Sequence, residues 1–328
     1  MASVLVTGGA GFIGSHVARA LVEQGNRVVA LDSLDPYYDP ARKLANVADL
    51  RDSDSFTFVQ GDIRDNALVE KLFSDNAFDA VVHLAARAGV RASVDEPLLY
   101  YDVNLNGTIV LLEAARKQWA ARSGNDRPVF VIASTSSVYG ATERIPFTED
   151  DPCDRPLAPY PASKRAAEMI GFAFHHLYGI DVTALRFFTV YGPAGRPDMM
   201  AYLVADNITR GHEVTLYDQG DMHRDWTYVD DITNGVLAAS KTPLGYEVIN
   251  LGRGQPTKLA EFVSLIETEF GERAQLVDAT RPSTDIPYTY ADIDKARRLL
   301  GYDPQVSVDE GVRRFAQWYQ RVVLKDRS

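Results

Sequence analysis

The 328-residue sequence predicts an α/β protein, in which a doubly wound parallel sheet is followed by a smaller C-terminal lobe. Six short runs rich in β-branched residues alternate with segments long enough for helices, which is typical of parallel strands joined by helical crossovers. Beyond Tyr191 the alternation loosens, and Pro, Gly and Asp separate shorter elements. The six expected strands are SVLVTG (3–8), RVVALD (27–32), FTFVQGD (56–62), DAVVHLAA (79–86), PVFVIAS (128–134) and DVTALRFF (181–188).

Composition and charge narrow the function classes. The formal net charge of −11 disfavours a general affinity for nucleic acid or an anionic membrane, so we expect small molecules and other protein chains as partners. The start, MASVLVTGG, lacks a basic segment followed by an apolar core, and the single cysteine, Cys153, has no internal partner. We therefore expect a cytoplasmic protein without a metal site, in which Cys153 is incidental.

A glycine pattern follows the first expected strand. In TGGAGFIG, Gly8, Gly11 and Gly14 stand between that strand and the helical pattern HVARALVEQ, where glycine allows a tight turn and a close approach to a pyrophosphate. The second strand ends in Asp32, which is placed to accept hydrogen bonds from an adenosine ribose and would repel a 2′-phosphate. These residues predict a Rossmann-type fold that binds NAD rather than NADP. The tripeptide GDI, at 61–63, is expected to flank the adenine.

A second motif, YPASK, places Tyr160 and Lys164 four residues apart at the start of an expected helix, so both side chains emerge from one face. A free phenol has a pKa of about 10, and a nearby ammonium together with a positive nicotinamide makes it a better base. Pro161 is tolerated in a first helical turn. We expect Tyr160 to act as a general base that Lys164 assists.

With these motifs the chain resembles the extended short-chain dehydrogenase/reductase family over nearly its whole length. The matching pieces are TGGAGFIG, GDI, HLAA, STSSVYG, YPASK and RDWTYVDDI. The resemblance implies that Thr135, 25 residues before Tyr160, bridges the tyrosine to the substrate hydroxyl. Relatives that dehydrate nucleotide sugars have STDEVYG here, and those that decarboxylate UDP-glucuronate have STSEVYG. Ser136 and Ser137 supply no carboxylate, which leaves oxidation and re-reduction of an alcohol, that is, epimerisation.

The substrate is indicated by RFFTVYGPAGRPDM, at 186–199, which closely resembles the corresponding segment of UDP-glucuronic acid 4-epimerases. DPYYDP (35–40) and HLAARAGVR (83–91) carry the same resemblance. UDP-galactose 4-epimerases typically have asparagine at the position of Thr189 and lack a counterpart of Arg196. We therefore expect Thr189 and Arg196 to hold a C5 carboxylate, with UDP-glucose/UDP-galactose 4-epimerisation as the alternative. A non-catalytic NAD-binding regulator would lack the Tyr160/Lys164 pair.

The resemblance also implies the remaining contacts and the assembly. Arg224 and Arg281 match arginines that neutralise the diphosphate, although one extra residue near Arg281 departs from the usual RPGD or QPGD. Residues 1–188 with 225–250 are expected to form the NAD-binding domain, and 189–224 with 251–328 the nucleotide-sugar lobe. A homodimer is expected through helices at 101–117 and 162–177. Further expected contacts to NAD are Phe12, Ile13, Asp62, Ile63, Leu84, Ala85 and Ala86, and those to the UDP-sugar are Val90, Arg91, Ser136, Ser137, Leu216 and Tyr217.

Overall fold

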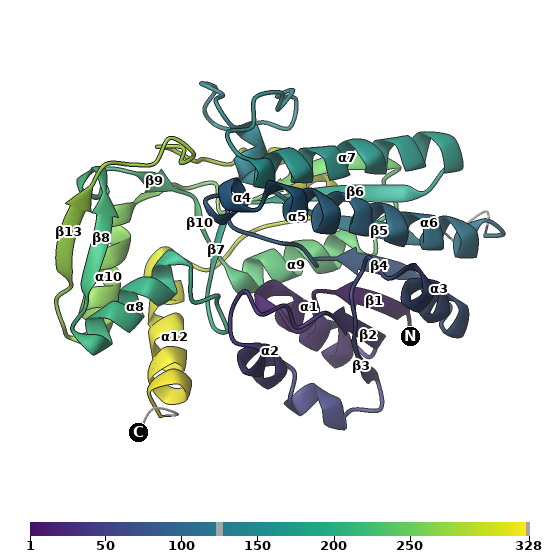
Figure 1. Cartoon of the computed structure of the whole chain (residues 1–328), viewed down its shortest axis with the longest axis horizontal. Helices are drawn as coiled ribbons and strands as arrows, with labels where there is room; N and C mark the ends of the chain where they lie inside the picture. Colours follow the sequence, from purple (N-terminus) through teal and green to yellow (C-terminus); the bar gives the residue numbers. More distant parts are fainter. Residues whose placement is uncertain (123–126, 326–328) are drawn as a thin grey trace.

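The computed structural model describes residues 1–122 and 127–325, and its largest element is a seven-stranded parallel sheet (Figure 1). The strand order is β11-β6-β5-β4-β1-β2-β3, and each neighbouring pair is parallel. This is a Rossmann-type doubly wound sheet, as predicted. The strands are β1 (Ser3–Thr7), β2 (Arg27–Asp32), β3 (Phe56–Gln60), β4 (Ala80–His83), β5 (Val129–Thr135), β6 (Asp181–Phe187) and β11 (Tyr246–Leu251).

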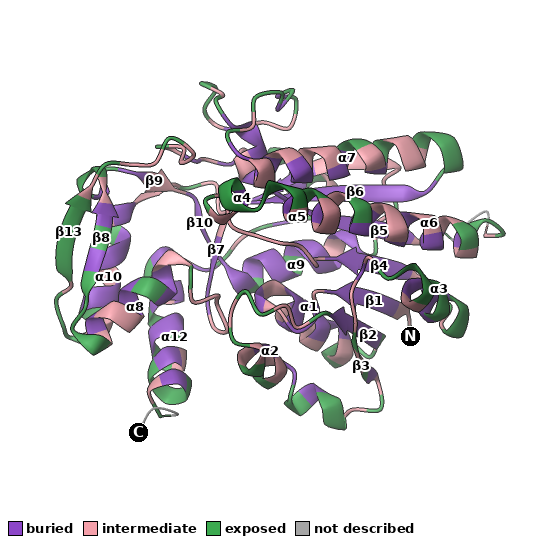
Figure 2. Ribbon diagram, viewed as in Figure 1, coloured by how far each residue is buried: buried purple, intermediate pink, exposed green. Residues whose placement is uncertain are grey.

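Helices cover both faces of the sheet because successive residues of each buried strand point to opposite sides. Leu5 of β1 packs with one group of helices, whereas Val4 and Val6 pack with the other. The first group is α3 (Asn66–Asp75), α6 (Gly107–Trp119) and α7 (Pro159–Tyr178). The second group is α1 (Phe12–Glu23) and α9 (Val229–Ala239). Figure 2 shows the buried strands between these partly buried helices.

All six expected strands are present in the central sheet, which also contains one described strand that was not predicted. β11, with the sequence YEVINL, pairs with β6 and forms the edge of the sheet. The expected helix at 101–117 is divided in the structure: α5 (Pro97–Tyr101) leads through a π-helical turn (Asp102–Asn106) into α6. Two short helices, α2 (Pro40–Asn46) and α4 (Ala92–Asp95), lie in the loops after β2 and β4.

The smaller lobe lies beyond the carboxyl ends of the strands (Figure 1). The lobe contains three two-stranded ladders, β10-β7, β12-β9 and β13-β8. Its helix α10 packs against both α8 and α12. The predicted division into domains at 188/189, 224/225 and 250/251 stays a prediction. The elements are β7 (Thr189–Tyr191), α8 (Met200–Arg210), β8 (Glu213–Tyr217), β9 (His223–Arg224), β10 (Trp226–Tyr228), β12 (Thr257–Lys258), α10 (Leu259–Phe270), β13 (Gln275–Ala279), α11 (Asp294–Leu300) and α12 (Val308–Trp318).

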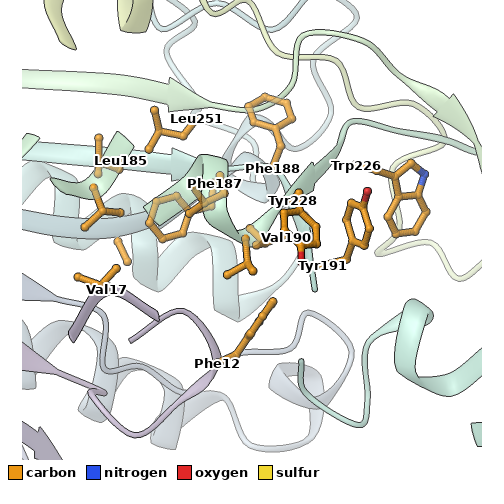
Figure 3. Packing of buried hydrophobic residues seen from close by; sticks show 14 of the residues in the cluster. Phe12, Val17, Leu185, Phe187, Phe188, Val190, Tyr191, Trp226, Tyr228 and Leu251 are labelled. Carbon is orange, nitrogen blue, oxygen red and sulfur yellow. The ribbon is translucent and has the colours of Figure 1, made fainter. Parts of the chain in front are cut away.

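One aromatic cluster joins the sheet to the lobe. Figure 3 shows the buried side chains running from Leu185 and Phe187 of β6 to Tyr191 of β7 and Trp226 of β10. Trp226 stacks on Phe262 of α10 with ring centroids 3.7 Å apart. The lobe is therefore anchored next to the strand ends, where ligands bind in such folds. None of the described helices is both long and apolar enough to cross a bilayer.

Candidate active site

A pocket opens at the carboxyl ends of β1 to β5, and the predicted cofactor residues meet there. Because these ends share one edge of a parallel sheet, loops far apart in the sequence become neighbours. Tyr160 and Lys164 of α7 and Arg196 of the lobe line the same pocket. The loop residues in its wall that were predicted to contact NAD are Gly8, Gly11, Phe12, Ile13, Gly14, Asp32, Asp62, Ile63, Leu84, Ala85 and Ala86.

The glycine loop is shaped for an anion. Gly8 has a φ of +67°, and a Cβ on Gly14 would overlap the carbonyl oxygen of Gly8, so neither position accepts another side chain. Gly11 is the N-cap of α1 and offers no side-chain oxygen to the first N–H groups of the helix. These N–H groups therefore remain for a ligand, and the pocket fits the pyrophosphate of a dinucleotide.

Asp32 is buried at the end of β2 and is oriented by backbone donors. Its carboxylate accepts hydrogen bonds from the amides of Ala10 at 3.2 Å and Leu34 at 2.9 Å. The sequence did not predict that Lys43 of α2 would place its ammonium 4.0 Å from this carboxylate, over the ring of Tyr38. Lys43 and Tyr38 both line the pocket. In the sequence Lys43 is indistinguishable from a surface lysine on an amphipathic helix, so only its buried position marks it.

Hydrogen bonds to its backbone fix Tyr160 at the start of α7. The amide of Tyr160 donates to the hydroxyl of Ser93 at 3.1 Å, and the carbonyl of Tyr160 accepts from Ser163 at 2.7 Å. Asn104, within the π-helical turn, donates to the Ser163 hydroxyl at 2.9 Å. These three polar residues were not predicted, because their role depends on contacts between distant loops.

The electrostatics of the pair are set by burial. Burial raises the pKa of Tyr160, and the charge of Arg196 and a hydrogen bond with Thr135 partly oppose this effect. Burial also lowers the pKa of Lys164 to about 8, although the nearby Glu168 carboxylate opposes that shift. Lys164 is only 3% exposed. Burial therefore opposes ionisation of the Tyr160 phenol, which needs further positive charge to ionise near neutral pH.

The four hydroxyls after β5 have different partners. Ser134 donates to Glu168 at 2.5 Å, and Glu168 also pairs with Arg186, so Ser134 belongs to a buried polar network. Thr135 is directed toward Tyr160 and Ser137, and its hydroxyl lies 3.3 Å from that of Ser137. Ser136 is buried in the short 3₁₀ helix (Ser136–Tyr139) that follows the strand. No carboxylate replaces these hydroxyls at 136 and 137.

The remaining predicted substrate residues lie mainly in the lobe. Arg196 is 22% exposed and forms an ion pair with Asp198. Thr189 begins β7, and its amide donates to the backbone carbonyl of Asp225 at 3.1 Å. Neither Thr189 nor Val90 lines the pocket, and the carbonyl of Val90 accepts the Ser93 hydroxyl at 2.6 Å.

Three arginines form a second positively charged region, which we call the arginine cluster: Arg91, Arg224 and Arg281. Arg91 pairs with Asp285 at 2.6 Å and donates to the hydroxyl of Tyr217 at 3.0 Å. Burial lowers the pKa of Arg224 to about 10, and the charges of Arg281 and Arg91 add to this effect while Asp285 opposes it. The structure therefore brings Tyr217 and the three predicted arginines together.

Leu216 and Cys153 are both buried and, in the part of the chain that the structure describes, have no contact that indicates a role in binding or catalysis. Leu216 is buried in the core cluster of the lobe, because alternate residues of β8 point inward. Cys153 is buried, and burial raises the pKa of its thiol to about 12, which makes it a poor nucleophile. Among the described residues there is no group of three or more His, Cys, Asp or Glu side chains arranged to hold a metal ion.

Comparison with known proteins identifies the family to which the chain belongs. Residues 5–315 match the family model described as GDP-mannose 4,6 dehydratase. The UDP-glucuronate 4-epimerase of Thermodesulfobacterium geofontis is 41% identical over 97% of this chain and 96% of its own. The UDP-glucuronic acid 4-epimerase of Bacillus cereus, solved with UDP-glucuronic acid and NAD, has a TM-score of 0.89 and 33% identity over 98% of this chain and 99% of its own. The UDP-glucose 4-epimerase of Thermotoga maritima, solved with UDP-glucose, has a TM-score of 0.87 and 31% identity over the same shares.

Proposed function

The chain belongs to the GDP-mannose 4,6-dehydratase family, and on that premise we propose that it is an NAD-dependent UDP-glucuronate 4-epimerase. The enzyme interconverts UDP-glucuronic acid and UDP-galacturonic acid through a 4-keto sugar. The observation that carries this function is the position of Arg196 in the wall of the pocket that also holds Tyr160 and Lys164.

Dehydration, the reaction that gives the family its name, does not fit the residues after β5. Eliminating water across C5 and C6 needs a carboxylic acid and a carboxylate, whereas this chain has the hydroxyls of Ser136 and Ser137. Glu168 is the nearest carboxylate partner of this segment, and it is fully buried in its pair with Arg186. Hydroxyls orient a sugar and relay a proton without catalysing elimination.

The chain's own residues move the proton. Tyr160 takes the proton of the C4 hydroxyl, with Thr135 hydrogen-bonded between or beside the two oxygens. Lys164 stabilises the phenolate through its positive charge, and Ser93 and Ser163 keep the start of α7 in place. When bound, NAD would supply the hydride acceptor in its oxidised form and the hydride donor in its reduced form. Tyr160 then returns the proton to the C4 oxygen.

We assign Arg196 to the substrate carboxylate, and Thr189, which lies outside the pocket wall, stays a predicted second contact. A 4-keto sugar with a C5 carboxylate is a β-keto acid: its C5–C6 bond breaks readily when perpendicular to the carbonyl plane. The bond's electron pair then moves toward the C4 oxygen, CO₂ leaves, and C5 later takes a proton. A guanidinium that holds the carboxylate near the plane slows this loss. Arg196 supplies a charge-assisted hydrogen bond of the required strength.

The arginine cluster is proposed to bind the diphosphate. Three guanidiniums are accompanied by two carboxylates, Asp285 beside Arg91 and Asp218 beside Arg281, which leaves a net positive charge for the diphosphate. Tyr217 lies against Arg91, with the guanidinium 4.4 Å from the ring centroid, and is placed to border the uracil. Leu216 is proposed to support this wall from the core side.

We also propose a cytoplasmic homodimer. Apolar side chains are exposed on α4, α5 and α7, including Leu98 at 84% and Met169 at 60%, and α7 packs against both other helices. A second copy of the chain would cover this face (Figure 2). Light scattering should give twice the mass of the chain. Replacing Phe172 of α7, which is 53% exposed, by glutamate should lower that mass. The single buried cysteine suits a reducing compartment.

The test is to incubate the purified protein with UDP-glucuronate and, separately, with UDP-glucose, without adding NAD. We expect UDP-galacturonate from the first and much less UDP-galactose from the second. The alternative, a UDP-glucose 4-epimerase, is favoured by the close structural likeness to the Thermotoga maritima enzyme. Conversion of UDP-glucose alone would establish that alternative.

A further inference from the structure

Two side chains from different parts of the sequence hold the guanidinium of Arg196. Its Nε and Nη2 atoms donate to the two carboxylate oxygens of Asp198, at 2.9 and 2.7 Å. Tyr37, 161 residues earlier, donates its hydroxyl to the same carboxylate at 3.2 Å. Burial raises the pKa of Asp198, but the hydrogen bonds from Arg196 and Tyr37 outweigh it and keep the pKa below its ordinary value. Asp198 is therefore an anion that fixes the plane of the guanidinium.

Tyr37 is itself held in place. Its amide donates to Asp35 at 2.9 Å, and Arg87 donates to the same carboxylate oxygen of Asp35 at 2.6 Å. The guanidinium of Arg87 lies 5.1 Å from the ring centroid of Tyr37. The phenol oxygen occupies a notch at Gly89, where a Cβ would stand only 2.9 Å from it. Tyr37 therefore reaches Asp198 from a loop of fixed shape.

This arrangement decides which end of Arg196 meets a ligand. Nε and Nη2 are committed to Asp198, whereas Nη1 makes no hydrogen bond to any residue that the structure describes. Arg196 lines the pocket with Tyr160 and is close enough to lower the pKa of that phenol. A carboxylate in the pocket would therefore meet one defined edge of the guanidinium. Its direction depends on Asp198, and the position of Asp198 depends on Tyr37.

We propose that Asp198 and Tyr37 are positioning residues that aim Arg196 at the substrate carboxylate and so determine the preference for UDP-glucuronate over UDP-glucose. This inference rests on the proposed function. Tyr37 stands in the loop after β2 and itself lines the pocket, whereas Arg196 belongs to the lobe. The loop after β2, in the cofactor-binding half, thus sets the preference of the sugar-binding half for UDP-glucuronate over UDP-glucose.

The first experiment introduces Tyr37→Phe into the wild type and into Arg196→Ala, and measures kcat and KM with both sugars. For a sugar that is bound without turnover, the inhibition constant replaces KM. We expect Tyr37→Phe to lower kcat/KM for UDP-glucuronate roughly three- to tenfold, with little change for UDP-glucose. In the Arg196→Ala background the same substitution should have no further effect, because the guanidinium that Tyr37 helps to position is absent. The matched control is Tyr319→Phe, which removes another phenol on a lobe carboxylate, Asp206, and should leave the ratio between the sugars unchanged.

The second experiment compares Asp198→Ala with Asp198→Asn. If Asp198 positions Arg196, the alanine variant loses about tenfold on UDP-glucuronate and the asparagine variant, which keeps the shape and one acceptor oxygen, loses less. If Asp198 instead competes with the substrate for Arg196, both variants gain on UDP-glucuronate. That gain would overturn the inference. So would equal losses on both sugars, or an undiminished effect of Tyr37→Phe in the Arg196→Ala background.

The wild-type enzyme separates this failure from a failure of the proposed function. If the wild type converts UDP-glucuronate and the variants change both sugars alike, only the positioning role is wrong. If the wild type converts UDP-glucose alone, the proposed function is wrong and the inference falls with it.

Discussion

The two walls of the cleft present their charge in different ways. The sheet wall offers backbone N–H groups at the start of α1, together with Asp32, which backbone amides already orient. The opposite wall, which we call the lobe wall and which is formed by the lobe and by Arg91 at the N-cap of α4, offers arginines, most of which are already bound to a carboxylate of the same chain. These pairs are Arg91 with Asp285, Arg196 with Asp198 and Arg281 with Asp218.

This difference suits two ligands with different lifetimes. The sheet wall is preorganised, so we expect a dinucleotide to bind without breaking protein contacts and to be retained through many cycles. On the lobe wall, a sugar nucleotide must share or replace internal carboxylates, which lowers the net gain from each ion pair and allows exchange. We expect the purified protein to carry NAD and to release its sugar readily.

The largest effect is expected from Tyr160→Phe, which removes the proposed general base and leaves the NAD-binding residues of the sheet wall unchanged. Losing a positioned general base costs about 10²- to 10⁴-fold in rate. NAD content, read from the absorbance of released nucleotide, should stay near that of the wild type. Turnover close to the wild-type value would remove Tyr160 from the role of base.

Lys164→Met is expected to abolish activity and yet to stabilise the nucleotide-free protein. Lowering the Lys164 pKa from 10.5 to about 8 corresponds to a folding cost of up to about 3 kcal/mol at pH 7, where the amine is charged in both states. The cost shrinks as the pH rises above 8, because the folded amine is then neutral, and it vanishes near 10.5. Urea unfolding at pH 7 and pH 10 measures the gain. A variant less stable than the wild type at pH 7 would contradict it.

Arg196→Ala tests the lobe wall. Losing one charge-assisted hydrogen bond of about 1.5–3 kcal/mol should weaken the use of UDP-glucuronate roughly ten- to a hundredfold and spare any use of UDP-glucose. We also expect this variant to release UDP-4-keto-pentose and CO₂. Equal losses on both sugars would exclude contact with the carboxylate, whereas selective loss without pentose would refute only the protective role.

The smallest effect is expected from Asp32→Ala, which should weaken NAD binding about tenfold and relax the discrimination against NADP. Lys43, 4.0 Å from Asp32, remains to attract a 2′-phosphate once the carboxylate is gone. Mass analysis of the nucleotide released from wild type and variant decides the point. Mainly NADP in the wild-type protein would overturn the assignment.

The same comparison explains how much the sequence could predict. Asp32 ends one strand of the parallel sheet, and Asp62 and Leu84 follow two others, so their convergence on one pocket follows from the strand pattern alone. Tyr160 and Lys164 stand four apart on one helix, so local geometry places them together. Both predictions rest on patterns in neighbouring residues and on the parallel sheet that the alternation of strands and helices favours.

The unpredicted parts depend on long-range contacts. Asp285 meets Arg91 across 194 residues, and Tyr37 meets Asp198 across 161, separations at which no local pattern specifies a partner. β11 was missed because YEVINL lies beyond Tyr191, where the alternating pattern loosens, and its pairing with β6 identifies it as a strand. The arginines could be predicted as ligand-binding residues, but the carboxylates that hold them could not.

The central claim is that the hydrogen removed from C4 returns to C4 while the carboxylate stays on the sugar. Incubating the protein with UDP-glucuronate deuterated at C4 in ordinary water, followed by NMR and mass spectrometry of the products, tests this directly. We predict UDP-galacturonate that retains the deuterium at C4 and all six sugar carbons. Unlabelled UDP-galacturonate, or a pentose as the main product, would contradict the account.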